Sequence, residues 1–282
     1  MDGSSPGSTL TLASAVPNPQ GASGRLFLLE GNAASGAADR ITMAPGVTFP
    51  PAPGVLQAGS FGLRIIHFND FHGQMLRFSQ GGARSIVSRV AWHIAASRQQ
   101  CQGETHCGVL ALSAGDECGG SVFDLLIDSS GERVSHLYYR IYSELGVDAG
   151  CPGNHDFDRG LDFLESAVQA EAQFPMLAAN VISTDDFTWG IYPGAIFVLK
   201  GVRVGLIGLV TRAENRLTEE EGRIVDPRPV ARQMVDLLRP MCDVLVILTH
   251  LGRELRDHSV PMADCGDVEL ARAIPEEDDC VD

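Results

Sequence analysis

The chain has 282 residues, of which 44% are hydrophobic and 20% are charged, so it can bury a sizeable core and is not disordered throughout. Its 36 acidic residues outnumber its 21 basic ones, and the formal net charge of −15 argues against binding to nucleic acid or to an anionic membrane surface. No stretch reaches the roughly 18–20 apolar residues of a membrane-spanning helix.

Residues 1–60 differ in composition from the rest of the chain. They hold seven of the fifteen prolines in a background of Ala, Gly and Ser. Such a composition is typical of a flexible leader or linker, here with residues 25–29 as a lone strand. The start of the chain also lacks the basic residues and apolar run of an export signal. We therefore expect a flexible Pro/Gly/Ser/Ala-rich leader over 1–60 and a folded domain over 61–282.

From residue 63 onward, short apolar runs alternate with helical stretches. In chain order we expect a strand over 63–68, a helix over 83–100, a strand over 108–113, a helix over 133–145, a strand over 147–151, a helix over 161–172, a strand over 176–181, a hairpin over 195–210, a helix over 229–239 and a strand over 244–248. This alternation predicts an α/β layered sheet with an inserted β-hairpin.

The seven cysteines include no Cys-x-x-Cys pair, which argues against a zinc–thiolate site. Cys101 and Cys107 close a short loop that suits a disulfide, and Cys265 and Cys280 flank another irregular stretch. Because the number of cysteines is odd, this pattern leaves the cellular compartment open.

Polar side chains gather where four of the expected strands end. They are Asp70 and His72 after the strand over 63–68, Asp116 after 108–113, Asn154, His155 and Asp158 after 147–151, and His250 after 244–248. In an open α/β sheet, ligands bind outside the carboxyl ends of the strands. Each residue alone is explained as a loop cap, but four ordered strand ends together favour a single site.

Carboxylate, amide and imidazole groups together suit divalent ions such as Zn²⁺, Mn²⁺ or Fe²⁺. Asp70 and His72 lie two residues apart and can reach one ion from a single turn. Asp116 has two oxygens and can bridge to a second ion, which Asn154 and His250 would also bind. Paired ions about 3.5–4 Å apart activate a water or hydroxide and hold the attacking and leaving oxygens of a phosphoryl group.

Two further roles follow from position. His155 comes directly after Asn154 and would face the substrate, with Asp158 orienting its ring. This pair would stabilise developing charge or protonate the leaving group. Asn180, at the end of the strand over 176–181, either binds the substrate or fixes a turn.

Five motifs stand at these positions: Asn69-Asp70-Phe71-His72-Gly73, Gly115-Asp116, Gly153-Asn154-His155-Asp156-Phe157-Asp158-x-Gly160, Ala179-Asn180-Val181 and Thr249-His250-Leu251-Gly252. In this order they resemble the calcineurin-like metallophosphoesterases, and within them the 5′-nucleotidase/UDP-sugar hydrolase branch, over about residues 63–280. The resemblance implies a four-layer α/β/β/α sandwich. It also implies one metal ion on Asp70, His72 and Asp116, another on Asp116, Asn154 and His250, and a catalytic dyad of His155 and Asp158.

The activity implied by the resemblance is that of a 5′-nucleotidase: release of phosphate from nucleoside 5′-phosphates by attack of a metal-bound water or hydroxide. The alternatives are the same core acting on 2′,3′-cyclic nucleotides, nucleotide sugars or a sulfur ester, and a truncated, non-catalytic remnant. The branch also implies a small-molecule nucleotide as the binding partner and a periplasmic or extracellular location.

The sequence departs from the family pattern at its end. The family continues past the last helix, here 267–273, into a strand ending in Gly-His-x-His or Gly-His-x-Gln that supplies one further ligand to each metal ion. Here the chain stops at 280–282, at the approach to that strand, and the second domain of the branch is absent. We therefore expect a sandwich incomplete at its C-terminus, with three protein ligands per metal ion and an unpaired sheet edge.

Overall fold

The computed structural model describes residues 8–34, 38–51, 60–79, 82–118, 137–183, 190–212, 217, 222–253 and 265–274. Over these residues the chain forms two large sheets, two short two-stranded ribbons and five α-helices. Within the same residues, none of the helices has the length and apolar character needed to cross a membrane.

The first sheet consists of parallel strands. Its order is β11 (Ile191–Tyr192), β9 (Met176–Leu177), β8 (Ala149–Gly150), β7 (Cys107–Ser113) and β4 (Gly62–Phe68). All four neighbouring pairs run in the same direction. Every residue of β7 is buried, as the unbroken apolar run of a parallel strand covered on both faces requires. The carboxyl ends of β4, β7 and β8 therefore meet at one edge.

The second sheet has mixed strand directions. Its order is β15 (Val244–His250), β13 (Val202–Val210), β12 (Gly194–Leu199), β2 (Arg25–Glu30), β1 (Ser8–Ala15) and β3 (Ala38–Met43). The predicted hairpin is confirmed as β12 and β13, which turn at Lys200-Gly201 with positive φ at both residues. β13 and β15 are parallel, and their register pairs Val210 with His250. His250 thus stands at the carboxyl end of β15, beside the carboxyl end of β13.

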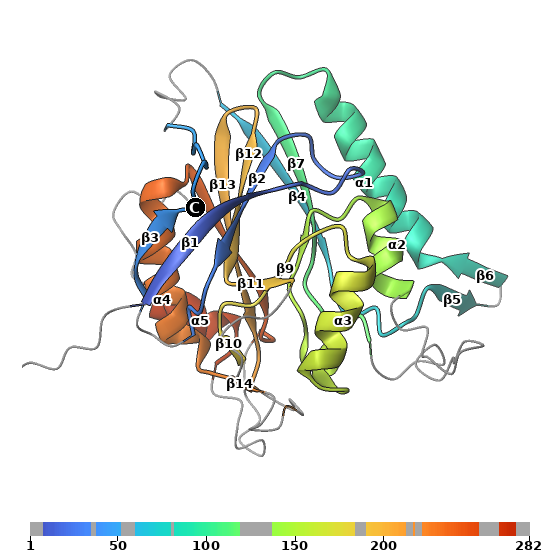
Figure 1. Ribbon diagram of the computed structural model, residues 1–282. Coiled ribbons are helices and arrows are strands. Elements are labelled where there is room, and N and C mark those ends of the chain that lie inside the picture. The colour runs from blue at the N-terminus through green and yellow to red at the C-terminus, as the bar shows by residue number, and fades with distance from the viewer. Residues whose placement is uncertain are drawn as a thin grey trace, which may run out of the picture.

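Four layers result from the way in which the helices cover the two sheets (Figure 1). α1 (Ile86–Gln102), α2 (Leu137–Leu145) and α3 (Leu161–Glu171) cover the parallel sheet, and α4 (Pro227–Leu238) and α5 (Asp267–Ala273) cover the mixed sheet. Between the sheets, Leu110 and Leu112 of β7 pack in one buried cluster with Phe197 and Leu206. The predicted α/β/β/α layering is therefore confirmed.

The expected flexible leader over 1–60 is wrong for the part of that segment that the structure describes. β1 and β2 extend the mixed sheet beyond β12, and β3 pairs in parallel with β1. Leu10, Leu12 and Leu29 are fully buried and pack in one cluster with Met234 of α4. Of the Pro, Gly and Ser residues that suggested a leader, those that the structure describes lie largely in the connections. A few alternating apolar side chains supply the buried face of the strands.

Smaller differences concern element boundaries. The helix expected over 83–100 begins later, because Gly82–Ser85 forms β6 and pairs with β5 (Leu76–Ser79). The strand expected over 176–181 is divided into β9 and β10 (Val181–Ser183), and β10 pairs with β14 (Gly222–Ile224). Two 3-10 helices cover Asn154–Phe157 and Arg239–Met241. Residues 133–136 and 280–282 lie outside the described residues.

Candidate metal centre

The loops that follow β4 and β7 run side by side and prolong the parallel pairing of these strands. Asp70 N donates to Gly115 O at 2.9 Å, and His72 N donates to Asp116 O at 3.0 Å. Asp70, His72 and Asp116 all adopt left-handed backbone conformations, with φ of 55°, 44° and 58°. Such conformations cost of order 1–3 kcal/mol each and persist only where the surrounding contacts impose them, which happens most often at functional sites.

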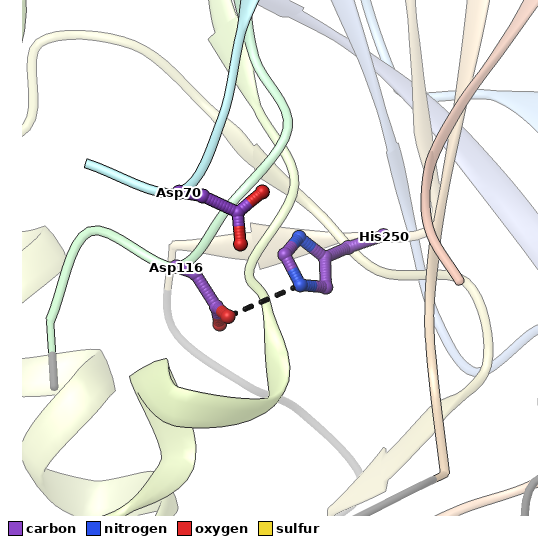
Figure 2. Close-up of side chains that lie close together, drawn as sticks. All are labelled: Asp70, Asp116 and His250. Carbon is purple, nitrogen blue, oxygen red and sulfur yellow. Dashed lines mark ion pairs between the residues drawn. The ribbon is translucent and has the colours of Figure 1, made fainter. Parts of the chain in front are cut away.

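The carboxylate of Asp116 is buried at the centre of the site. Its Oδ2 lies 3.2 Å from His250 Nε2 and 3.6 Å from His72 Nε2, and its Oδ1 accepts the backbone N–H of His155 at 2.9 Å. Asp70 Oδ1 lies 3.5 Å from His72 Nε2. The side chains of Asp70, Asp116 and His250 point toward one another (Figure 2), with one ligand atom from each within 4.8 Å of the others.

His250 is oriented by the backbone. Its Nδ1 donates to Ala114 O at 2.5 Å, so Nε2 is the nitrogen that faces Asp116. Burial lowers the pKa of His250, but the hydrogen bond and charge of Asp116 and the Ala114 carbonyl outweigh burial and raise this pKa to about 9. Burial likewise raises the pKa of Asp116, and His250 more than offsets that effect. A metal ion bound here would take the place of the shared proton.

His155 and Asp158 form a hydrogen-bonded pair at the edge of the site. His155 Nδ1 lies 3.1 Å from Asp158 Oδ2, and both side chains are partly exposed. The ring centroids of His155 and His72 are 5.4 Å apart. Asn154 begins the same 3-10 helix and is half-buried, next to the backbone N–H that contacts Asp116. The loop after β8 thus joins the loops after β4 and β7.

Asp156 holds two of these loops together, a role that the sequence did not suggest. Its buried carboxylate accepts four backbone N–H groups at 2.8–3.1 Å, from Gly153, Asp116, Glu117 and Cys118. Burial raises the pKa of Asp156 to about 6. The loops approach so closely that a Cβ on Gly115, which has φ 88°, would lie 2.2 Å from Gly153 N. Only glycine fits there.

Glu117 is a second buried acid that was not predicted. Ser113 Oγ donates to its Oε1 and Tyr142 Oη donates to its Oε2. Burial, together with the negative charge of Asp156, raises the pKa of Glu117 to about 8. The available signal was an acid directly after a candidate ligand. Its partner Tyr142 comes from α2, 25 residues away, so the pairing was not readable from local sequence.

The contacts of Asn180 are those of the turn-fixing alternative. Its side chain is fully buried. Asn180 Nδ2 donates to Val210 O at 2.8 Å and to Val225 O at 3.1 Å, and its Oδ1 accepts Val210 N–H at 3.0 Å. With both amide hydrogens and the oxygen engaged by backbone, this side chain clamps the turn between β9 and β10 to the end of β13.

Comparison with known proteins gives a consistent result. No family model matches the chain. A 5′-nucleotidase from Vibrio parahaemolyticus is 29% identical over 225 residues, covering 78% of this chain and 38% of that protein. Protein UshA from Salmonella pullorum is 28% identical over 254 residues, covering 85% of this chain and 43% of that protein. The chain thus spans about two fifths of the length of these curated relatives.

Solved structures share the fold. The 5′-nucleotidase precursor from Thermus thermophilus aligns with a TM-score of 0.54 and 26% identity, over 68% of this chain and 38% of that one. The calcineurin-like phosphoesterase YfkN from Bacillus subtilis aligns with a TM-score of 0.57 and 24% identity, over 76% of this chain and 69% of that one. With the strand-end motifs and the layered fold, these likenesses lead to one conclusion. The chain is similar in fold to a calcineurin-like phosphoesterase and similar in sequence to 5′-nucleotidases.

Proposed function

We propose that the chain is a metal-dependent phosphoester hydrolase that releases phosphate from nucleoside 5′-phosphates. The observation that carries this proposal is the convergence of Asp70, Asp116 and His250, whose ligand atoms lie within 4.8 Å of one another. The His155–Asp158 pair beside them supplies a group for proton transfer. The names of the relatives support a nucleotide as the small-molecule substrate.

The donor set fits two divalent ions that share Asp116. Asp70, His72 and Asp116 would hold one ion, and Asp116, Asn154 and His250 the other. Carboxylate, amide and imidazole donors suit Zn²⁺, Mn²⁺ or Fe²⁺. Two such ions would also offset the negative charge of this acid-rich part of the molecule. When bound, the ions supply Lewis-acid polarisation of the phosphoryl group and activation of water.

The remaining chemistry belongs to His155 and Asp158. Nδ1 of His155 faces Asp158 Oδ2 at 3.1 Å, so Nε2 is the ring nitrogen that would be turned toward a substrate. From this position the ring would hydrogen-bond the leaving oxygen and give it a proton, while Asp158 orients the ring and stabilises its protonated form. Neither role requires the two side chains to move apart.

We propose that the protein works in an oxidising compartment, the periplasm or the cell exterior. Cys101 and Cys107, whose short loop suits a disulfide, form one that joins the end of α1 to the start of β7. Disulfides persist in exported proteins and are rare in reducing compartments. Mass spectrometry of the native protein with and without reduction tests this placement, and a wholly reduced pair in freshly isolated protein would contradict it.

The activity is tested with the purified chain and a panel of AMP, 2′,3′-cyclic AMP and UDP-glucose, with products followed by chromatography. We expect hydrolysis of AMP in Mn²⁺ and none in EDTA. Asp116→Asn is the matched control, because asparagine tolerates a left-handed backbone but has only one side-chain oxygen. Hydrolysis of 2′,3′-cyclic AMP or UDP-glucose without hydrolysis of AMP would assign the chain to that other substrate class. No hydrolysis by the Mn²⁺-loaded chain would contradict the proposed function.

A further inference from the structure

We propose that Glu117 is a positioning residue for the metal centre, held by Ser113 and Tyr142 so that the preceding residue, Asp116, keeps the orientation in which it faces both His72 and His250. This inference rests on the proposed function, since it assigns Glu117 a role in metal binding. We call Glu117, Ser113 and Tyr142 the Glu117 network. The side chains of its members are buried and would act through the orientation of Asp116.

The side chains of the Glu117 network hold the loop after β7 through buried hydrogen bonds. Glu117 and Ser113 are 1% exposed and Tyr142 is 0% exposed. Ser113 is the last residue of β7, whereas Tyr142 comes from the middle of α2. The carboxyl group of Glu117 is therefore hydrogen-bonded to two elements that belong to different layers. It cannot shift without breaking a buried hydrogen bond.

The backbone of Glu117 adds two further hydrogen bonds, to Gly73 and to Asp156. Its carbonyl oxygen accepts Gly73 N–H at 3.1 Å, and its N–H donates to Asp156 Oδ1 at 3.1 Å. Glu117 thus contacts the loop that carries His72 and the acid that braces the turn of His155. Asp116, one residue earlier, is held at φ 58°. A non-glycine residue keeps such a conformation only when its neighbours impose it.

Energetics favour a role in geometry over one in stability. Burying a carboxyl group is costly, and replacing a buried polar cluster with well-packed apolar residues is often neutral or stabilising. An apolar residue at position 117 would fill the same space without that cost. Two hydroxyl groups converge instead on one buried acid beside the central ligand. Contacts behind metal ligands fix the ligand orientation, and their loss commonly costs about 10–100-fold in metal affinity.

The test measures Mn²⁺ affinity by electron paramagnetic resonance on the full chain, after circular dichroism has shown each variant to be folded. Tyr142→Phe removes one donor to Glu117, and Glu117→Leu removes the acid. The conservative variant is Glu117→Gln, which retains a hydrogen bond to each hydroxyl. Tyr139→Phe is the matched control. Tyr139 is a buried tyrosine of the same helix whose hydroxyl finds no hydrogen-bond partner in the described part of the chain.

We expect Tyr142→Phe and Glu117→Leu to bind Mn²⁺ at least about tenfold more weakly, with an altered spectrum of the bound ion. Glu117→Gln and Tyr139→Phe should stay close to the unsubstituted chain. Unchanged affinity in the first two variants would overturn the inference. An equal loss of Mn²⁺ affinity in Glu117→Gln would also overturn it, because the charge of Glu117 and not its hydrogen bonds would then account for the effect. Absence of Mn²⁺ binding by the unsubstituted chain would overturn the proposed function as well.

Discussion

The ion pair between His250 and Asp116 makes the stability of the metal-free chain depend on pH. The pKa of His250 is about 9 in the folded chain, against 6.5 for an ordinary histidine. Burial acts to lower this pKa, but the hydrogen bond and charge of Asp116 act more strongly to raise it. Because the folded pKa lies above the unfolded one, the stabilisation is fully present below pH 6.5 and is lost as the pH rises through about 9.

The size of the effect follows from the two pKa values. Each pH unit between them is worth about 1.4 kcal/mol. His250 should therefore contribute about 3 kcal/mol to the free energy of unfolding in mildly acidic solution. The side chain of His250 is only 12% exposed, so solvent screens this contribution little. The same proton must leave before a metal ion binds, so Mn²⁺ affinity should rise by about tenfold per pH unit below pH 9.

The assay is urea unfolding of the chain and of His250→Gln in EDTA, at about pH 6 and about pH 9.5. Glutamine keeps a hydrogen-bonding group but does not titrate. The difference in unfolding free energy between the two proteins should be about 3 kcal/mol smaller at the higher pH. Comparing the two proteins cancels the titration of other groups, such as Glu117. A difference that is the same at both pH values would show that the His250–Asp116 pair does not couple stability to pH.

Three further predictions address the dyad, the disulfide and the buried clamp. His155→Ala should lower kcat for AMP by about two orders of magnitude or more while Mn²⁺ binding is retained, and unchanged turnover would refute the dyad. Replacing Cys101 and Cys107 with serine should lower the free energy of unfolding by about 2 kcal/mol for so short a loop, seen as a lower Tm in calorimetry with metal affinity intact. Asn180→Ala should lower the free energy of unfolding in urea by about 1–3 kcal/mol, because it leaves Val210 N–H without its hydrogen-bond acceptor. KM should not change, and a raised KM with unchanged stability would indicate that Asn180 contacts the substrate.

The site was largely readable because most of its residues follow strands that end at one edge of the parallel sheet, although His250 comes from the mixed sheet. Asp70, His72 and Asp116 lie just after β4 and β7, which pair in parallel, and His250 ends β15. Residues that directly follow neighbouring parallel strands lie close together in space, so their positions after the predicted strands indicated that they are neighbours. The functional roles of these residues stay predictions until they are tested. The layered α/β architecture was predicted for the same reason, from alternating strand and helix patterns.

The remaining features depend on partners far away in the chain. β2 is held by pairing with β12, and the apolar side chains of β1 and β2 are buried against α4, whereas composition alone made that segment look like a linker. Glu117 is a buried acid only because Tyr142 of α2 reaches it. No local pattern distinguishes a buried acid from an exposed one, since the distinction is made by tertiary contacts.

We propose that Asp116 would bind both metal ions where these loops meet. Equilibrium dialysis against Mn²⁺, followed by elemental analysis, counts the ions bound per chain. We predict two ions for the unsubstituted chain and at most one for Asp116→Asn, since asparagine has a single side-chain oxygen and cannot serve both. Fewer than one ion per unsubstituted chain, or a count that Asp116→Asn leaves unchanged, would contradict the claim.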